Sequence, residues 1–229
     1  MTDLCLFDLD DTLLPLDSDH AWGEFVTALG WVDGAAFRAR NDAFFADYRA
    51  GTLDIHAYVA FSTQPLQGRD AATLAAAQAR FMREVIAPQI RPAALDLVRR
   101  HGRQGDLIAL VTATNDFVTA PIAAAFGIEH LIAVRLQHDA AGTITGRIDG
   151  TPSFREGKVA RVDEWLAGLG RRWSDFVSTT VYSDSINDLP LLERASLPVA
   201  TNPSAPLEAL ARERGWPIKR LFDDQDPHR

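Results

Sequence analysis

The chain has 229 residues, of which 47% are hydrophobic, which is enough for one large domain or for one domain that carries a sizeable insertion. A formal net charge of −8 opposes nonspecific binding to nucleic acid or to anionic lipid, and no run of about 18 apolar residues exists to span a bilayer. We therefore expect a cytoplasmic globular protein with a small-molecule partner, and neither a nucleic-acid nor a membrane partner.

The chain begins with a short apolar run that ends in acid. Residues 4–7 are all hydrophobic, as is typical of a strand in a parallel sheet that is covered on both faces. Asp8 and Asp10 follow at the carboxyl end of this strand, where the crevice of an open α/β sheet lies. Two carboxylates so close repel each other, and a hard cation such as Mg²⁺ relieves that repulsion. The same residues could equally form a solvated turn, because Asp is common in turns.

A helical pattern without a strand signal follows. Aromatic and aliphatic residues recur at helical spacing, and an alanine-rich stretch predicts a helix over residues 69–85. Prolines mark both edges of this block. We expect residues 15–88 to form a helical cap domain above the acidic loop, and residues 1–14 and 89–229 to form the core domain.

Helices and strands alternate along the rest of the chain. The apolar runs predict strands over residues 107–111, 132–136, 177–182, 197–200 and 218–222. The stretches between them predict helices over residues 92–101, 116–126, 156–169 and 205–214. Residues 143–148 look like one arm of a small hairpin. Because strands separated by helices imply right-handed crossovers, the predicted fold class is α/β, with a Rossmann-like, doubly wound parallel sheet.

Three more polar residues fall at the ends of these elements. Thr112 and Asp184 each follow a predicted strand, and Lys158 lies in the first turn of a predicted helix, where the backbone favours anions. The carboxyl ends of parallel strands face one crevice, so these residues should meet Asp8 there.

This ordered set resembles the four motifs of the haloacid dehalogenase superfamily of phosphohydrolases. The motifs here are Asp8-Leu9-Asp10-Asp11-Thr12, Thr112, Lys158 and Asp184-Ser185-Ile186-Asn187-Asp188. The match covers the whole chain in layout. A helical insertion after the first motif is the arrangement of the superfamily's first cap class, and the fourth motif looks most like the phosphoserine phosphatase-like branch. One departure is Asp11, which stands where glycine is frequent.

The resemblance implies a Mg²⁺-dependent phosphatase that works through an aspartyl-phosphate. Asp8 would be the nucleophile, and Asp10 would protonate the leaving alkoxide and then activate water. Asp8 and Asp184, with the backbone carbonyl of Asp10, would hold the Mg²⁺. The phosphoryl oxygens would be bound by Thr112, Lys158 and backbone N–H groups near Leu9 and Ala113. The supporting residues would be Thr12, Asn187 and Asp188.

The resemblance also bears on the substrate. In the phosphoserine phosphatase-like branch, an acidic residue nine positions after the nucleophile contacts the substrate's amino group, and here that position is Asp17 in place of the usual Glu. The arginine that grips the substrate carboxylate in that branch has three candidates here, Arg38, Arg40 and Arg49, and none is compelling. Phosphoserine and an amino-alcohol phosphate such as histidinol phosphate therefore have similar weight.

Two further functions stay open. A phosphotransferase would use the same intermediate with an acceptor other than water, and a phosphate-ligand binding protein would keep the fold without turnover. The complete set of four motifs favours hydrolysis of a small phosphomonoester.

Overall fold

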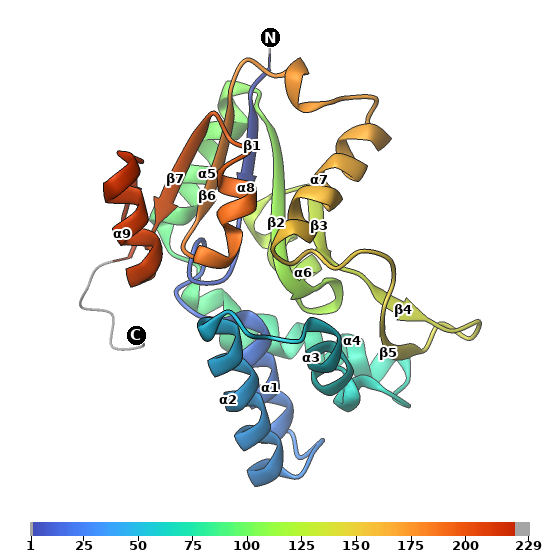
Figure 1. The fold of residues 1–229 in the computed structure, drawn as a ribbon. Coiled ribbons are helices and arrows are strands. Elements are labelled where there is room, and N and C mark those ends of the chain that lie inside the picture. The colour runs from blue at the N-terminus through green and yellow to red at the C-terminus, as the bar shows by residue number, and fades with distance from the viewer. Residues whose placement is uncertain (1, 223–229) are drawn as a thin grey trace.

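A six-stranded parallel sheet lies at the centre of the computed structural model, which describes residues 2–222 (Figure 1). In sheet order the strands are β3 (His130–Val134), β2 (Leu107–Asn115), β1 (Leu4–Phe7), β6 (Thr179–Ser183), β7 (Leu197–Thr201) and β8 (Ile218–Lys219). The chain builds one side of the sheet from β1 to β3 and returns to β6 beside β1. The strand order reverses there, which is where ligands bind in open α/β sheets. The predicted doubly wound α/β fold is confirmed.

β1 separates two hydrophobic cores, because side chains alternate between the faces of a strand. Leu4 and Leu6 pack on one face with α7, α8 and α9, whereas Cys5 and Phe7 pack on the other with α5 and α6. All four are buried, which explains why the run is continuously apolar. These helices are α5 (Pro92–Gln104), α6 (Asp116–Phe126), α7 (Glu156–Gly168), α8 (Leu189–Leu192) and α9 (Ala205–Arg214).

A group of helices between β1 and α5 lies at the carboxyl ends of the strands (Figure 1). The predicted helix over residues 69–85 begins at Ala71, because the Asp70 carboxylate caps it by accepting a hydrogen bond of 2.8 Å from the Thr73 N–H. None of the helices in residues 2–222 combines the length and apolar character needed to cross a membrane. The group consists of α1 (Ser18–Ala28), α2 (Gly34–Ala50), α3 (Ile55–Ser62) and α4 (Ala71–Phe81), followed by a π-helical turn over Met82–Ile86.

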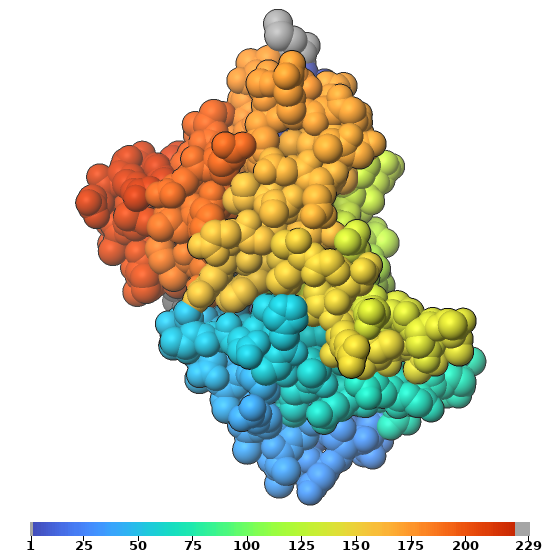
Figure 2. Space-filling view, turned by 45° about the vertical axis from the view of Figure 1, so that its right-hand side comes forward, coloured from blue at the N-terminus to red at the C-terminus, as the bar shows by residue number. Residues whose placement is uncertain are grey.

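The helical group packs directly on the sheet part of the molecule. One hydrophobic cluster runs from Phe7 of β1 to Trp22 of α1, whose ring makes edge-on contacts with the neighbouring aromatics. Figure 2 shows the segment around residues 50–60 against the segment around residues 150–158. The Gly51 carbonyl accepts a hydrogen bond from Arg155 at this contact. The helices are therefore held over the end of the sheet.

The predicted strand over residues 132–136 is wrong as a single element. β3 ends at Val134, and β4 (Leu136–His138) then pairs antiparallel with β5 (Ile144–Ile148). The exposed Arg135 stands between the two strands and interrupts the apolar run at the break. The hairpin leaves the sheet and lies beside α3 (Figure 1).

Candidate active site

Lys158 holds a positive charge next to Asp8. It lies in the first turn of α7, is 1% exposed, and its Nζ donates to Asp8 Oδ1 at 2.8 Å and to Asp188 Oδ2 at 2.7 Å. Burial alone would lower the pKa of Lys158, but the charges of Asp188 and Asp8 together raise it. The ammonium therefore stays charged between two carboxylates that come from opposite ends of the sequence.

The hydroxyl group of Thr12 connects Asp8 with Asp184. Thr12 Oγ1 lies 3.3 Å from Asp8 Oδ2 and 3.0 Å from Asp184 Oδ1, and it accepts a hydrogen bond of 2.9 Å from the Asp184 N–H. The loop after β1 and the loop after β6 are thus joined through one side chain. Because β1 and β6 are adjacent parallel strands, their carboxyl ends bring these residues together.

The oxygen atoms around Asp184 suit a divalent cation. Burial, followed by repulsion from the Asp8 carboxylate, raises the pKa of Asp184 well above its usual range, so its charge lacks a nearby counter-charge. In residues 2–222, no three or more His, Cys, Asp or Glu side chains are grouped to hold a metal. The expected set of Asp8, Asp184 and the Asp10 carbonyl has only two such side chains. Carboxylate and carbonyl oxygens with room for waters are what Mg²⁺ prefers.

Asp10 lies in a different environment from Asp8. Its Oδ1 accepts a hydrogen bond of 2.7 Å from the Ser18 N–H, and its Oδ2 accepts one of 2.8 Å from Thr114 Oγ1. Burial, with repulsion from Asp17, raises the pKa of Asp10 well above its usual range. The Asp8 carboxylate thus contacts an ammonium, whereas the Asp10 carboxylate contacts neutral donors. Such a difference in environment allows one carboxylate to act as a nucleophile and the other as a proton donor.

The loop after β1 is tightly folded around Leu9. The carbonyl of this buried residue accepts hydrogen bonds from the N–H groups of Thr12, Leu13 and Leu14. Asp11 has φ 54°, a left-handed conformation that glycine adopts most easily, which accounts for the glycine that is frequent in the resembled motif. The loop can therefore keep its shape with an aspartate at this position.

Thr112 and Ala113 lie opposite this loop on β2, which runs to Asn115 and is longer than predicted. The Thr112 hydroxyl is buried and accepts a hydrogen bond of 3.1 Å from the Thr114 N–H. The pairing of β2 with β3 shifts register between Val111 and Asn115, and Thr114 also lies in the site, where its hydroxyl donates to Asp10.

The fourth motif supports Lys158 and also contacts the helical group. Asp188 Oδ2 accepts a second hydrogen bond of 2.7 Å from Ser183 Oγ, which fixes the carboxylate that holds Lys158. Asn187 Nδ2 donates to the carbonyl oxygen of Tyr48 in α2 at 3.0 Å. The motif thus joins the sheet to the helices above it.

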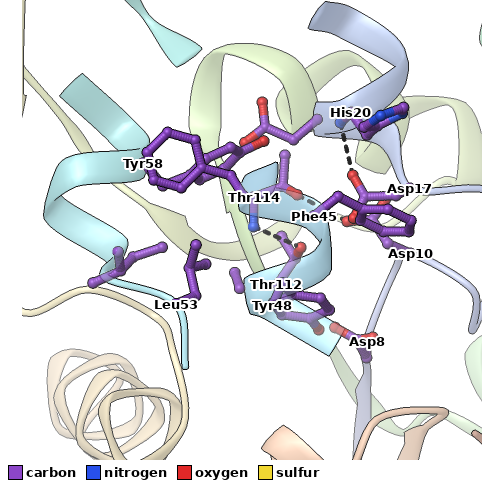
Figure 3. Close-up of a pocket in the computed structure, with 14 residues that line it drawn as sticks. Asp8, Asp10, Asp17, His20, Phe45, Tyr48, Leu53, Tyr58, Thr112 and Thr114 are labelled. Atoms are coloured by element: carbon purple, nitrogen blue, oxygen red, sulfur yellow. Dashed lines mark hydrogen bonds between the residues drawn. The ribbon is translucent and has the colours of Figure 1, made fainter. Parts of the chain in front are cut away.

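A pocket of about 490 Å³, open to solvent, lies between the sheet and the helices (Figure 3). Its core wall consists of Asp8 and Asp10 after β1 and of residues 112–114 on β2. The remaining lining residues, from the loop before α1 to α3, form its helical wall. Tyr48 and Phe45 of this wall face the core carboxylates in Figure 3. The pocket is lined by Asp8, Asp10, Asp17, Asp19, His20, Phe44, Phe45, Tyr48, Leu53, Ile55, Tyr58, Thr112, Ala113 and Thr114.

Four lining residues are aspartates, and none is lysine or arginine. The three arginine candidates for a substrate carboxylate are exposed and do not line the pocket. Arg38 lies 3.9 Å from the Glu24 carboxylate, and Arg40 and Arg49 lie over phenylalanine rings. The pocket is therefore strongly acidic apart from the Lys158 ammonium behind Asp8.

The sequence reasoning missed several lining residues of the helical wall. Asp19 and Tyr58 belong to helices whose packing fixes the directions of their side chains, and the helical pattern of the sequence contains no signal for these directions. Strand alternation did not give Thr114 either, because β2 is irregular between Val111 and Asn115 and three successive residues, 112–114, line the pocket.

Comparisons with known proteins agree with this geometry. The sequence model of the haloacid dehalogenase-like hydrolases matches residues 5–193, and the chain belongs to this family. A histidinol-phosphatase of Neisseria meningitidis serogroup C (strain 8013) is 43% identical over 218 residues, which are 95% of this chain and 98% of that protein. The enzyme is a phosphatase of this family, as the resemblance predicted.

Further similarities lie in the phosphoserine phosphatase-like branch. A phosphoserine phosphatase of Mycobacterium tuberculosis (strain ATCC 25618 / H37Rv) is 30% identical over 222 residues, which are 96% of this chain and 71% of that protein. A solved structure of a protein of unknown function from Bordetella pertussis Tohama I superposes with a TM-score of 0.92 at 50% identity, covering 97% of this chain and 100% of that one. A solved structure of a substrate-bound phosphoserine phosphatase superposes with a TM-score of 0.68 at 17% identity. The superposition covers 98% of this chain and 95% of that one, so the two proteins share the fold.

Proposed function

We propose that this phosphatase hydrolyses a small phosphomonoester that carries an amino group and no carboxylate, such as histidinol phosphate. The observation that supports this most directly is the composition of the pocket lining, in which Asp17 and Asp19 add two carboxyl groups to the catalytic pair and neither lysine nor arginine is present. A substrate carboxylate would meet carboxylates there, at a cost that grows as water is excluded. An ammonium group would meet favourable charge instead.

The shape and chemistry of the helical wall fit an aromatic substrate. Phe44, Phe45, Tyr48 and Tyr58 provide ring surfaces on which an imidazole can pack. The relative that is 43% identical is named a histidinol-phosphatase, which supports the same substrate. The arginines near this wall lie beside Glu24 or over the rings of Phe44 and Phe45, and none of them lines the pocket.

The proposed reaction uses Asp8 and Asp10 in turn. Asp8 attacks phosphorus, the bond to the ester oxygen breaks, and an aspartyl-phosphate forms. Asp10, whose raised pKa favours the protonated form, gives its proton to the leaving alkoxide. Asp10 then takes a proton from the water that releases phosphate, which restores both carboxyl groups. Thr114 and the Ser18 N–H orient Asp10 for both steps.

The phosphoryl oxygens would lie between Lys158, Thr112 and backbone N–H groups near Leu9 and Ala113, because these donors surround the nucleophile. Asp8, Asp184 and the Asp10 carbonyl would hold Mg²⁺, which supplies positive charge between nucleophile and phosphate. In this proposal residues 15–88 act as the cap domain that excludes water, and residues 1–14 and 89–229 as the core domain.

Phosphate release from a panel of esters tests the proposal. The panel contains histidinol phosphate, phosphoserine and a sugar phosphate, each with Mg²⁺ and with EDTA. We expect kcat/KM for histidinol phosphate to exceed that for phosphoserine by about 100-fold, because one buried charge clash costs on the order of 3 kcal/mol, and we expect EDTA to abolish turnover. A preference for phosphoserine, or tight binding of an ester without phosphate release, would contradict the proposal.

A further inference from the structure

Asp19 is a buried carboxylate that faces the pocket. It lies in the first turn of α1, is 4% exposed, and is one of the lining residues. Burial, followed by repulsion from Asp10, raises the pKa of Asp19 to about 7. The helix dipole stabilises anions in the first turn of a helix, but here this effect is smaller than the cost of burying the Asp19 carboxylate. The charge of Asp19 is therefore poorly balanced by its surroundings.

The partners of Asp19 are neutral and come from two other elements. Asn115 Nδ2 donates to Asp19 Oδ1 at 3.2 Å, and the nearby hydroxyl of Tyr58 lowers the pKa of Asp19. The orientation of the Asn115 amide is fixed, since its Oδ1 caps α6 by accepting from the Val118 N–H at 3.1 Å. Asp19 is thus positioned by α3 and by the junction of β2 with α6.

The pocket lining offers no cation to this carboxylate. His20 is its only basic residue, and its Nε2 lies 2.9 Å from Asp42 Oδ1 on α2. The carboxyl group of Asp17 lies close enough to interact with Asp19 and adds to the acidic surroundings. A buried carboxylate with neutral donors and acidic neighbours is a strong site for an ammonium group that enters with a ligand.

Asp17 has a different task. Its Oδ1 accepts a hydrogen bond of 2.7 Å from the His20 N–H and caps α1. The partner of Asp17 is a backbone N–H of its own helix, whereas Asp19 accepts from a side chain of another element, Asn115. The two aspartates can therefore be distinguished by geometry, although both line the pocket.

We propose that Asp19 binds the ammonium group of the substrate and thereby selects amino esters, with Tyr58 and Asn115 as positioning residues. This assignment rests on the proposed function. It places amine selection at a residue other than the one that the family resemblance suggested. The orienting donors come from both sides of the pocket, so amine binding also links the cap to the core.

The test compares histidinol phosphate with imidazolylpropyl phosphate, the same ester without the amino group. In Asp19→Asn, we expect kcat/KM for histidinol phosphate to fall about 100-fold, mainly because KM rises. The fall in kcat/KM for imidazolylpropyl phosphate should be at least about tenfold smaller. Asp17→Asn is the matched control, and its losses should be equal for the two esters because it acts through the cap of α1. Equal losses in Asp19→Asn, or a selective loss in Asp17→Asn, would overturn the assignment.

The variant Tyr58→Phe tests the same proposal if Asp19→Asn does not fold. It keeps the carboxylate and removes one donor, so we expect a selective loss of about fivefold for the amino ester. Equal losses for both esters would count against the assignment. If the wild-type enzyme hydrolyses neither ester, the proposed function itself fails, whereas failure of selectivity in the variants alone rejects only the role of Asp19.

Discussion

The two walls of the pocket are built by different means. The core wall is held by short polar contacts between strand ends, with Lys158 between Asp8 and Asp188. The helical wall presents aromatic rings and the carboxylates of α1 and the loop before it, with no lysine or arginine among them. The comparison suggests that one wall performs phosphoryl transfer and that the other selects the ester. Substitutions in the two walls should therefore have different kinetic effects.

The largest effect is expected from Asp8→Asn in the core wall. Removing the nucleophile should lower phosphate release at least about 10,000-fold, because no aspartyl-phosphate can form. Circular dichroism should show an unchanged fold, since asparagine keeps the shape of the side chain. Activity near that of the wild type would remove Asp8 from the chemistry.

Lys158→Met should be the most destabilising change in the core wall. Two buried carboxylates lose their shared cation, so we expect the free energy of unfolding to fall by about 3–5 kcal/mol in urea titrations. Adding Asp188→Asn should recover part of this loss, because it removes one unpaired charge. Additive losses in the double variant would mean that the two residues do not interact.

Asp19→Asn should stabilise the helical wall at high pH. The pKa of Asp19 is about 7 in the folded protein against an ordinary value of 3.8, so the folded state binds more protons between these values. The free energy of unfolding of the wild type therefore falls as pH rises from about 4 to 7. The Asp19→Asn variant does not show this contribution, because asparagine does not titrate. We expect the variant's advantage to grow by about 2–4 kcal/mol over this range. A constant difference at all pH values would contradict the burial of this charge.

Thr114→Val should affect catalysis without affecting the choice of ester. The variant removes the hydroxyl donor to Asp10 and keeps the side-chain volume, so we expect kcat to fall about tenfold for every substrate. Steady-state kinetics with two esters would check this. Different losses for the two esters would place Thr114 in substrate selection instead.

The smallest effect is expected from Arg40→Ala. Arg40 is exposed and lies 4.4 Å from the centre of the Phe44 ring, outside the pocket. Its removal should change kcat/KM by less than about twofold. A selective loss with phosphoserine would reveal a carboxylate contact that the pocket lining does not contain.

The core wall could be predicted from the sequence because strand periodicity and parallel topology place its residues. The apolar run over residues 4–7 indicated a central strand, and the carboxyl ends of β1, β2 and β6 necessarily share one edge of the sheet. The predicted strand over residues 132–136 shows where the pattern was not enough, because the chain changes sheet at Arg135, between Val134 of β3 and Leu136 of β4.

The helical wall could not be predicted in the same way. Asp19 and Tyr58 are 39 positions apart and meet only because α1 and α3 pack against the same end of the sheet. A periodic pattern tells which residues are apolar on a helix, not where that helix lies. The proposed role of Asp19 in substrate selection therefore rests on the structure and not on the sequence pattern.

Direct competition between two esters tests the central claim that the acidic pocket selects an amine without a carboxylate. Histidinol phosphate and phosphoserine are mixed at equal concentrations with the enzyme and Mg²⁺, and ³¹P NMR follows both signals. We expect histidinol phosphate to disappear at least about tenfold faster, because only phosphoserine brings a carboxylate toward Asp17 and Asp19. Equal consumption, or faster consumption of phosphoserine, would contradict the claim.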